Sequence, residues 1–265
     1  MYRRYFGFNA KPFSKTPDPK FLFYGKHYEE ALQRILYAIE ERELALLTGD
    51  VGVGKTTLIR VLLEQLTEDQ HAVSIIDPLL SPGQFMRALV KSLGSEPPKR
   101  MRADLVEQAQ NLLLSFHRQG RYPVVIIDEA QLCSKALLDE IRLITNFQLN
   151  HLNLLSLVLV GQTELRHRLR KPNYAPLRQR IGIHYHLEPL SPEDTISYVN
   201  HRLRRAGVRP TTVFSADALE AVHALSGGVP RVINVLCTNA MITAFTKKEK
   251  PVSLETLQEA AQEVV

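Results

Sequence analysis

The sequence lacks three features, and each absence argues against a class of protein. Its longest strongly apolar stretch, residues 152–160, is interrupted by polar residues and is far shorter than the roughly 20 apolar residues that a membrane-spanning helix needs. The basic start, residues 1–6, is not followed by the apolar run and cleavage site of a signal peptide. Cys133 and Cys237 are too few and too far apart for a disulfide scaffold or a metal-binding pair. We therefore expect a cytoplasmic protein without membrane insertion.

Low-complexity tracts and long blocks of one charge sign are also absent, so we expect a chain that is folded throughout. The length of 265 residues, 45% of them apolar, suits one large domain or two. Lys and Arg exceed Asp and Glu by 33 to 28. This mild basic excess permits an acidic partner such as nucleic acid, but it serves solubility equally well.

Up to residue 189, short apolar runs typical of strands alternate with segments that have helical periodicity. The predicted helices are 27–42, 56–66, 84–93, 104–117 and 135–147, and the predicted strands are 44–48, 72–76, 124–127, 154–160 and 184–187. Strands rich in Val, Ile and Leu, separated by helices, indicate a parallel five-stranded sheet covered on both faces, and hence an α/β fold.

Beyond residue 189 only helices are predicted, at 192–206, 216–225, 229–245 and 253–265. Ser191, Ser215 and Ser253 are the candidate N-caps. We therefore expect three parts: an N-terminal segment (1–26), an α/β nucleotide-binding domain (27–189) and an all-helical domain (190–265).

A phosphate-binding loop connects the first strand to the next helix. The segment GDVGVGKT fits the pattern G-x-x-x-x-G-K-[ST] in the required strand-to-helix context. Its glycines allow backbone N–H groups to surround the phosphates of ATP, its lysine supplies a positive charge and its threonine hydroxyl can bind Mg²⁺. The candidate nucleotide-binding residues are Gly49, Asp50, Val51, Gly52, Val53, Gly54, Lys55, Thr56 and Thr57.

Polar residues follow two of the other strands. Asp128 and Glu129 end the strand 124–127, where Asp128 is expected to hold Mg²⁺ and Glu129 to activate the attacking water as a general base. Gln162 ends the strand 154–160 and could touch the γ-phosphate or the water. Arg178 and Arg180 precede the last strand, and a further arginine, Arg231, enters a helix of the C-terminal part. Each offers a planar, permanently charged fork suited to phosphate oxygens.

Taken together and in this order, these motifs resemble an AAA+ ATPase with its helical lid, over nearly the whole chain. The resemblance implies that they are Walker A, Walker B, sensor 1, the arginine finger and the sensor 2 arginine. It also implies that Gln162 and Arg231 sense the γ-phosphate. Arg180, or alternatively Arg178, would then complete the site of a neighbouring subunit, so that hydrolysis requires a ring or a helical filament.

Within that family, several strings are similar to the ExeA/GspA-type secretion ATPases and the related MshM pilus protein, and more distantly to the transposition ATPases TniB, TnsC and MuB. The strings are FGF at 6–8, KPFS at 11–14, TPDP at 16–19, FLF at 21–23, IDEAQ at 127–131 and LVGQ at 159–162. The resemblance implies that Phe23, Tyr24 and His27 lie near the adenine. The same segment could equally be a hydrophobic lid on the core, and the two are compatible.

The biological role has two candidates. ExeA-type proteins carry a membrane segment and a peptidoglycan-binding domain after the ATPase, whereas this sequence ends at Val265. That difference and the basic balance favour a regulator that oligomerises on duplex DNA with ATP and recruits a transposase. The motif strings favour the alternative, a secretion or pilus assembly ATPase that acts on envelope proteins, and an ATPase domain cut from a longer envelope protein is a third possibility. The candidate phosphate contacts for DNA are Lys99, Arg100, Arg102, Arg166, Arg168, Arg170, Lys171, Arg202, Arg204, Arg205 and Arg209.

Overall fold

The computed structural model describes residues 1–14, 21–75, 77–95 and 101–263. Two compact units are present, and each is described by itself. The α/β unit comprises Glu30–Gly49 and Leu58–Leu187, and the helical unit comprises Met1–Glu29, Asp50–Thr57 and Glu188–Val265. This division groups both the N-terminal segment and the phosphate-binding loop with the C-terminal helices. The three-part division expected from the sequence remains a prediction.

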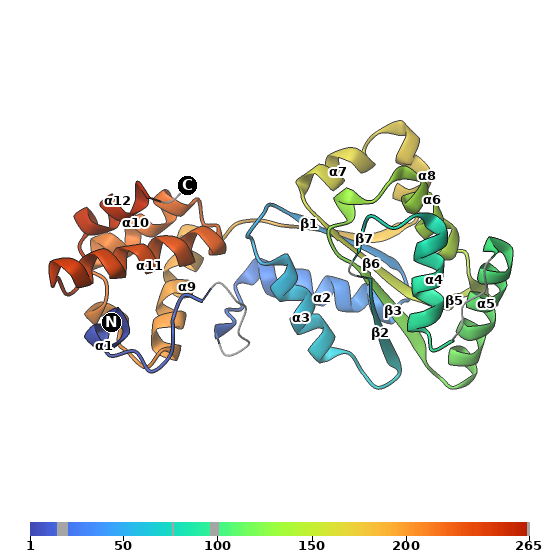
Figure 1. Cartoon of the computed structure of the whole chain (residues 1–265), viewed down its shortest axis with the longest axis horizontal. Coiled ribbons are helices and arrows are strands. Elements are labelled where there is room, and N and C mark those ends of the chain that lie inside the picture. Colours follow the sequence, from blue (N-terminus) through green and yellow to red (C-terminus); the bar gives the residue numbers. More distant parts are fainter. Residues whose placement is uncertain (15–20, 76, 96–100, 264–265) are drawn as a thin grey trace. The chain divides into compact units, whose positions relative to one another are not determined.

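A five-stranded sheet, in which every neighbouring pair is parallel, forms the centre of the α/β unit (Figure 1). Its order is β2 (Gln70–Ile75), β3 (Tyr122–Ile127), β6 (Ser156–Gly161), β1 (Leu44–Gly49) and β7 (Ile181–Leu187). All residues of β1, β3 and β6 are buried, as expected for strands covered on both faces. The predicted α/β fold class is therefore confirmed.

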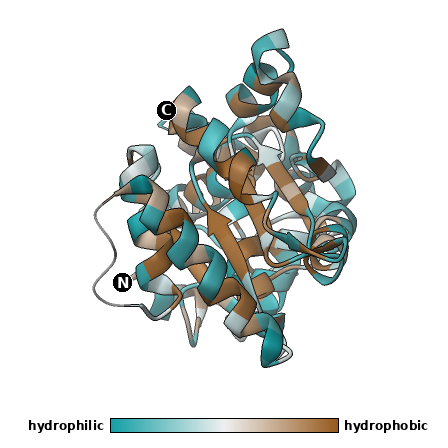
Figure 2. Ribbon diagram, turned by 90° about the vertical axis from the view of Figure 1, so that its right-hand side faces the viewer, coloured by the Kyte–Doolittle hydropathy of each residue, from teal (hydrophilic) through white to brown (hydrophobic). Residues whose placement is uncertain are grey.

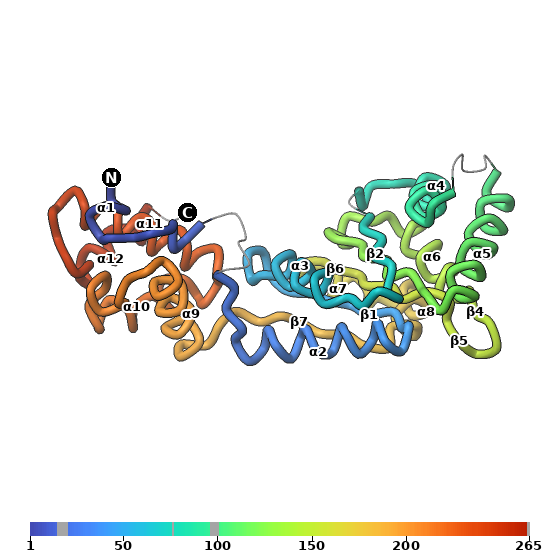
Figure 3. Tube along the Cα trace, turned by 90° about the horizontal axis from the view of Figure 1, so that it is seen from below, coloured from blue at the N-terminus to red at the C-terminus, as the bar shows by residue number. Residues whose placement is uncertain are grey.

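Helices cover this sheet on both faces. They are α2 (Lys26–Glu40), α3 (Lys55–Gln65), α4 (Pro82–Ser92), α5 (Arg102–Arg118), α6 (Lys135–Ile144), α7 (Thr163–Leu169) and α8 (Ala175–Arg178), with short 3-10 turns at Ala130–Leu132 and Pro172–Tyr174. In Figure 3, α2 lies on one side of the sheet and α4 on the other. Figure 2 shows the strands in brown between helices whose outer surfaces are teal, so the sheet is the apolar centre of this unit.

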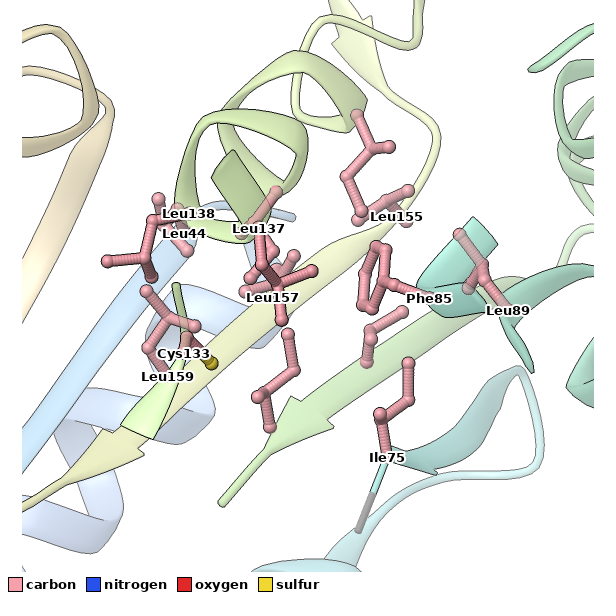
Figure 4. Close-up of a cluster of buried hydrophobic side chains, with 14 of the residues drawn as sticks. Leu44, Ile75, Phe85, Leu89, Cys133, Leu137, Leu138, Leu155, Leu157 and Leu159 are labelled. Atoms are coloured by element: carbon pink, nitrogen blue, oxygen red, sulfur yellow. The ribbon is translucent and has the colours of Figure 1, made fainter. Parts of the chain in front are cut away.

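One large apolar cluster fills the space between the sheet and the helices α4, α5 and α6. Figure 4 shows Leu157 of β6 beside Leu137 of α6, Leu159 of β6 beside Cys133, and Phe85 of α4 near Leu155. Cys133 lies in the same cluster, and burial raises the pKa of its thiol to about 11. A thiol in such surroundings stays protonated and is a packing residue. The alternate residues of the strands, which are also buried, face the other side of the sheet.

A short hairpin was not expected from the sequence. It pairs β4 (Gln148–Leu149) with β5 (Leu152–Asn153), and its two central residues, Asn150 and His151, both have positive φ. Two successive left-handed residues define the type I′ turn that suits a two-residue hairpin. The predicted helix 135–147 is consequently too long, because α6 already ends at Ile144.

The helical unit consists of α1 (Tyr2–Phe6), α9 (Pro192–Arg205), α10 (Ala216–Ser226), α11 (Pro230–Lys247) and α12 (Leu254–Ala261), with a 3-10 turn at Pro210–Thr212. The predicted N-caps of α9 and α12 are present, since the Ser191 and Ser253 side chains accept hydrogen bonds from the N–H groups of Asp194 and Thr256. Ser215 occupies the N-cap of α10 but makes no such hydrogen bond.

The N-terminal segment is part of the core of the helical unit. Phe6, Phe8 and Phe13 are buried in one cluster with apolar residues of α9 to α12, and α1 lies beside α11 (Figures 1 and 3). The Asn9 N–H donates to the Ala206 carbonyl at 2.9 Å. The aromatic strings of residues 6–14 therefore have a direct structural role.

Candidate nucleotide-binding site

The phosphate-binding loop is the turn between β1 and α3. Gly52 and Gly54 have φ values of +88° and +112°, which residues with a Cβ atom rarely adopt. Lys55 is buried, and its Nζ donates to the Asp50 carbonyl at 2.9 Å. Thr56, in the first turn of α3, is exposed. The lysine is thus held inside the loop, while the threonine side chain faces solvent.

Within the helical unit, the start of α11 packs against this loop. The Arg231 N–H donates to the Gly52 carbonyl at 3.2 Å, and a Cβ added at Gly52 would lie only 2.7 Å from the Cβ of Arg231. Gly52 is therefore required both for its backbone conformation and for this close approach. The side chain of Arg231 is exposed next to the loop, a position from which a guanidinium can reach bound phosphate.

The other predicted polar residues lie at the carboxyl ends of the sheet strands. Because β3, β6 and β1 are parallel neighbours, Asp128, Gln162 and the start of the loop at Gly49 share one edge of the sheet. This edge of an open parallel sheet is where such folds bind ligands.

Glu129 and Gln162 are in direct contact. The Gln162 Nε2 donates to the Glu129 Oε2 at 3.1 Å, and the Asp128 Oδ1 accepts from the N–H of Glu129 at 2.8 Å. Glu129 has a φ of +53°, which is uncommon for a residue with a side chain. A strained backbone at a carboxylate that caps a strand is typical of functional sites.

A third member of this cluster was missed by the sequence analysis. Gln131 donates from Nε2 to the Glu129 Oε2 at 2.5 Å and accepts the N–H of Gln162 on Oε1 at 3.0 Å. The only available signal was its place in the string IDEAQ, which carries no indication that its side chain turns back toward Glu129.

The two arginines before β7 have different surroundings. Arg178 donates from Nη1 to the carbonyls of Leu169 and Arg170, at 3.0 and 2.9 Å, and so caps the end of α7. Arg180 is exposed at the amino end of β7, at the sheet edge opposite the phosphate-binding loop. It lines a cavity of about 250 Å³ together with Glu43 and Gly182. Of the two, Arg180 has the guanidinium that is available to another molecule.

The segment expected near the adenine is divided between core and surface. The Phe23 ring lies 5.9 Å from the ring of Tyr198 and 5.9 Å from that of His201, at the edge of the helical core. Burial is the largest cause that lowers the pKa of His201, and the positive charges of nearby arginines lower it further. Tyr24 and His27 are exposed, with half of the Tyr24 surface accessible. The hydrophobic-lid interpretation suits Phe23, and an adenine contact remains a prediction for all three residues of the segment.

The structure corrects the list of candidate phosphate contacts for DNA. Arg202 is buried, with its Nε donating to the Pro12 carbonyl at 2.7 Å, and is a core residue of the helical unit. Arg168 is occupied by the Gln131 carbonyl and the Tyr174 hydroxyl, and Arg102 pairs with Glu140. Lys99 and Arg100 lie outside the described residues. The remaining candidates are Arg166, which is half-buried, and the exposed Arg170, Lys171, Arg204, Arg205 and Arg209.

Among the described residues, no group of three or more His, Cys, Asp and Glu could hold a metal ion. A Mg²⁺ ion that binds with nucleotide needs fewer protein ligands, because phosphate and water oxygens supply most of its shell. Thr56, which is exposed, carries a hydroxyl, and Asp128 carries a carboxylate; each is an oxygen donor of the kind that Mg²⁺ binds. In the parts of the chain that the structure describes, no helix is long and apolar enough to cross a membrane.

The fold and these motifs define a phosphate-binding-loop NTPase with an attached helical unit. Residues 38–169 match the model of a family described as AAA domain. The whole chain is 38% identical to General secretion pathway protein A of Aeromonas hydrophila but spans only 48% of that protein. It is also 28% identical, over 90% of its length, to the Holliday junction branch migration complex subunit RuvB of Lactobacillus delbrueckii subsp. bulgaricus, of which it spans 65%.

The solved structures show the same fold. The Cdc6p structure from Pyrobaculum aerophilum superposes with a TM-score of 0.70 at 18% identity, over 96% of this chain and 70% of that one. The chain therefore belongs to the AAA+ ATPases, and within them it is an ExeA/GspA-like member, as the sequence predicted. It spans about half the length of the secretion protein that it matches.

Proposed function

We propose that this chain binds ATP at the loop Gly49–Thr56 and hydrolyses it with Glu129 as the general base. The observation that supports this most strongly is the contact between Glu129 and Gln162 at the sheet edge where the loop leaves β1. A carboxylate and an amide held together there are the groups that can orient a water molecule toward a γ-phosphate.

The proposed reaction gives one role to each of these side chains. Lys55 exchanges its hydrogen bond with the Asp50 carbonyl for one with the β- and γ-phosphate oxygens. Glu129 accepts a proton from water as the water oxygen bonds to the γ-phosphorus and the bond to the β-phosphate oxygen breaks, which releases ADP and phosphate. Thr56 and Asp128 would hold Mg²⁺, which neutralises charge on the phosphates when bound. Arg231, beside the loop, senses the γ-phosphate.

Two substitutions separate binding from turnover. Lys55→Ala is expected to abolish nucleotide binding, because the phosphates lose their positive charge inside the loop. Glu129→Gln is expected to leave binding intact and to lower kcat by roughly 10²- to 10⁴-fold, the contribution of a general base. Titration with a fluorescent ATP analogue and phosphate release measure the two effects. Equal nucleotide affinity of Lys55→Ala and the wild type would refute the assignment of the loop.

We further propose that ATP switches the assembly of a secretion or pilus apparatus, with envelope proteins as partners. The support is the identity of 38% with General secretion pathway protein A along the whole chain. Duplex DNA, with a transposase, is the second candidate, favoured by the similarity to RuvB and by the exposed arginines of residues 204–209. The charge of the C-terminal part gives DNA no additional support, because residues 190–265 contain eight Lys and Arg against eight Asp and Glu.

Fluorescence anisotropy of labelled duplex DNA distinguishes the two partner classes. The protein is titrated with and without a non-hydrolysable ATP analogue, at two salt concentrations. Absence of binding even at low salt is the result expected for a protein partner. Binding that requires the analogue and weakens steeply with salt would instead identify a regulator that assembles on DNA.

A further inference from the structure

Gln131 holds Glu129 through a side-chain amide whose orientation is fixed. Its Oε1 accepts the N–H of Gln162, a backbone donor that cannot reverse, so its Nε2 must face the Glu129 Oε2. The end of β6 leaves room for this arrangement, because a Cβ added at Gly161 would come within 3.1 Å of the Gln131 Oε1 and within 2.6 Å of Leu165. The amide therefore fits tightly between two strand ends.

Two amides converge on one carboxylate oxygen. Both Gln131 and Gln162 donate to the Oε2 of Glu129, whereas its Oε1 receives no hydrogen bond from the residues that the structure describes. A carboxylate fixed through one oxygen keeps the other available to accept a proton from water.

The turn that carries Gln131 is itself tied to the next helix. Arg168 of α7 donates from Nη1 to the Gln131 carbonyl at 3.0 Å and from Nε to the Tyr174 hydroxyl at 2.9 Å. Its guanidinium also lies over the Tyr174 ring, 5.1 Å from the centroid. Tyr174 is buried and directly precedes α8, the short helix that leads to Arg180.

We propose that Gln131 is a positioning residue that orients Glu129 for proton transfer, and that Arg168 holds Gln131 in place from α7. This inference rests on the proposed ATPase activity, because it specifies how the general base of that activity is oriented. The proposal also concerns the segment from α7 to Arg180. Arg168 connects the backbone at Gln131 to Tyr174, so the segment that presents Arg180 to a neighbouring subunit also determines the orientation of Glu129.

The test compares Gln131→Met with Gln131→Asn and with the wild type in the full chain. Methionine keeps the length and most of the volume of glutamine but removes both hydrogen bonds, so we expect kcat to fall roughly 10-fold or more, as for the loss of a well-placed orienting group. The affinity for a fluorescent ATP analogue should stay within about 2-fold of the wild type, because Gln131 is distant in sequence and role from the loop. Gln131→Asn retains the amide on a shorter side chain and should recover part of the lost kcat.

Arg168 is tested with Tyr174→Phe and Arg168→Lys. Tyr174→Phe keeps the ring but removes the hydroxyl that accepts from Arg168 Nε. Arg168→Lys keeps the positive charge but cannot donate to both the Tyr174 hydroxyl and the Gln131 carbonyl as the guanidinium does. Both should lower kcat, and combining Arg168→Lys with Gln131→Met should cost less than the product of the two single effects. His167→Gln, at an exposed position of α7 next to Arg168, is the matched control and should turn over ATP like the wild type.

The outcomes separate this inference from the function on which it rests. If the wild type hydrolyses ATP, Glu129→Gln does not, and Gln131→Met retains the wild-type kcat, the positioning role is overturned while the ATPase assignment stands. If Gln131→Met loses nucleotide affinity together with kcat and Gln131→Asn restores neither, Gln131 is only structural. If the wild type and Glu129→Gln are equally inactive under all conditions, the proposed function itself fails.

Discussion

At the scale of single residues, Arg202 shows how a basic side chain can be a core residue. Its Nη1 donates to the Tyr198 hydroxyl at 2.5 Å, and its guanidinium lies over the rings of Tyr198 and Phe21. Burial raises the pKa of Tyr198, and the nearby positive charge of Arg202 opposes this shift. The arginine thereby ties the N-terminal segment to α9 through the Pro12 carbonyl.

Replacement of Arg202 should therefore affect stability rather than ligand binding. Arg202→Met leaves the Pro12 carbonyl without its donor, and we expect the free energy of unfolding to fall by about 2 kcal/mol, within the range for an unsatisfied buried group. Arg204→Ala, an exposed neighbour on the same helix, should change it by less than about 0.5 kcal/mol. Urea titration followed by circular dichroism compares the two. Equal stability of both variants would contradict a structural role for Arg202.

The same residue shows a limit of reasoning from sequence. Charge and spacing grouped Arg202 with Arg204 and Arg205, and nothing in that pattern distinguishes the one arginine that faces inward. Two of its partners, the Pro12 carbonyl and the Phe21 ring, are far away in sequence, so only the tertiary fold reveals them. Gln131 was missed for the same reason, because its contact with Gln162 joins two different strand ends.

At the scale of elements, the sequence predicted what local patterns determine. The five strands of the sheet were found because buried strands are continuous apolar runs, and most helices were found from their periodicity. The hairpin β4–β5 was not found, because its strands have two residues each and its turn, Asn150-His151, lacks the glycine that usually signals a type I′ turn. The short helices α1, α7 and α8 have too few turns to show periodicity.

The motifs of the N-terminal segment were recognised from the sequence, but their role in packing was not predicted. Its aromatic strings were informative as a family resemblance, but their packing partners are supplied by α9 and α11, which lie 190 and 225 residues later in the chain at the contacts of Pro12 with Arg202 and of Phe13 with Thr238. The candidate site was more predictable than this packing. The phosphate-binding loop and the polar residues at strand ends depend on local strand-to-helix connections, which short motifs encode directly.

At the scale of the whole molecule, we propose that a second subunit completes the active site. Arg180 lies at the amino end of β7, whereas the loop and Glu129 lie at the carboxyl edge of the same sheet. Because the length of a strand separates them, Arg180 cannot contact the nucleotide on which Glu129 of the same subunit acts. An exposed arginine on the far edge is suited to a head-to-tail assembly, in which each subunit completes the site of the next.

Mixing two inactive variants tests this arrangement. Arg180→Ala keeps its own nucleotide site but offers no arginine, and Glu129→Gln offers the arginine but cannot activate water, so we expect little turnover from either alone. In a randomly mixed assembly at equal amounts, about a quarter of the subunits have both an intact site and an intact neighbouring arginine, so turnover should return to about a quarter of the wild-type rate. The rate of phosphate release measures this turnover.

The control mixes Arg180→Ala with the double variant Arg180→Ala/Glu129→Gln. This mixture should restore no turnover, since no subunit then supplies the arginine. Full activity of Arg180→Ala alone would show that this arginine does not act between subunits.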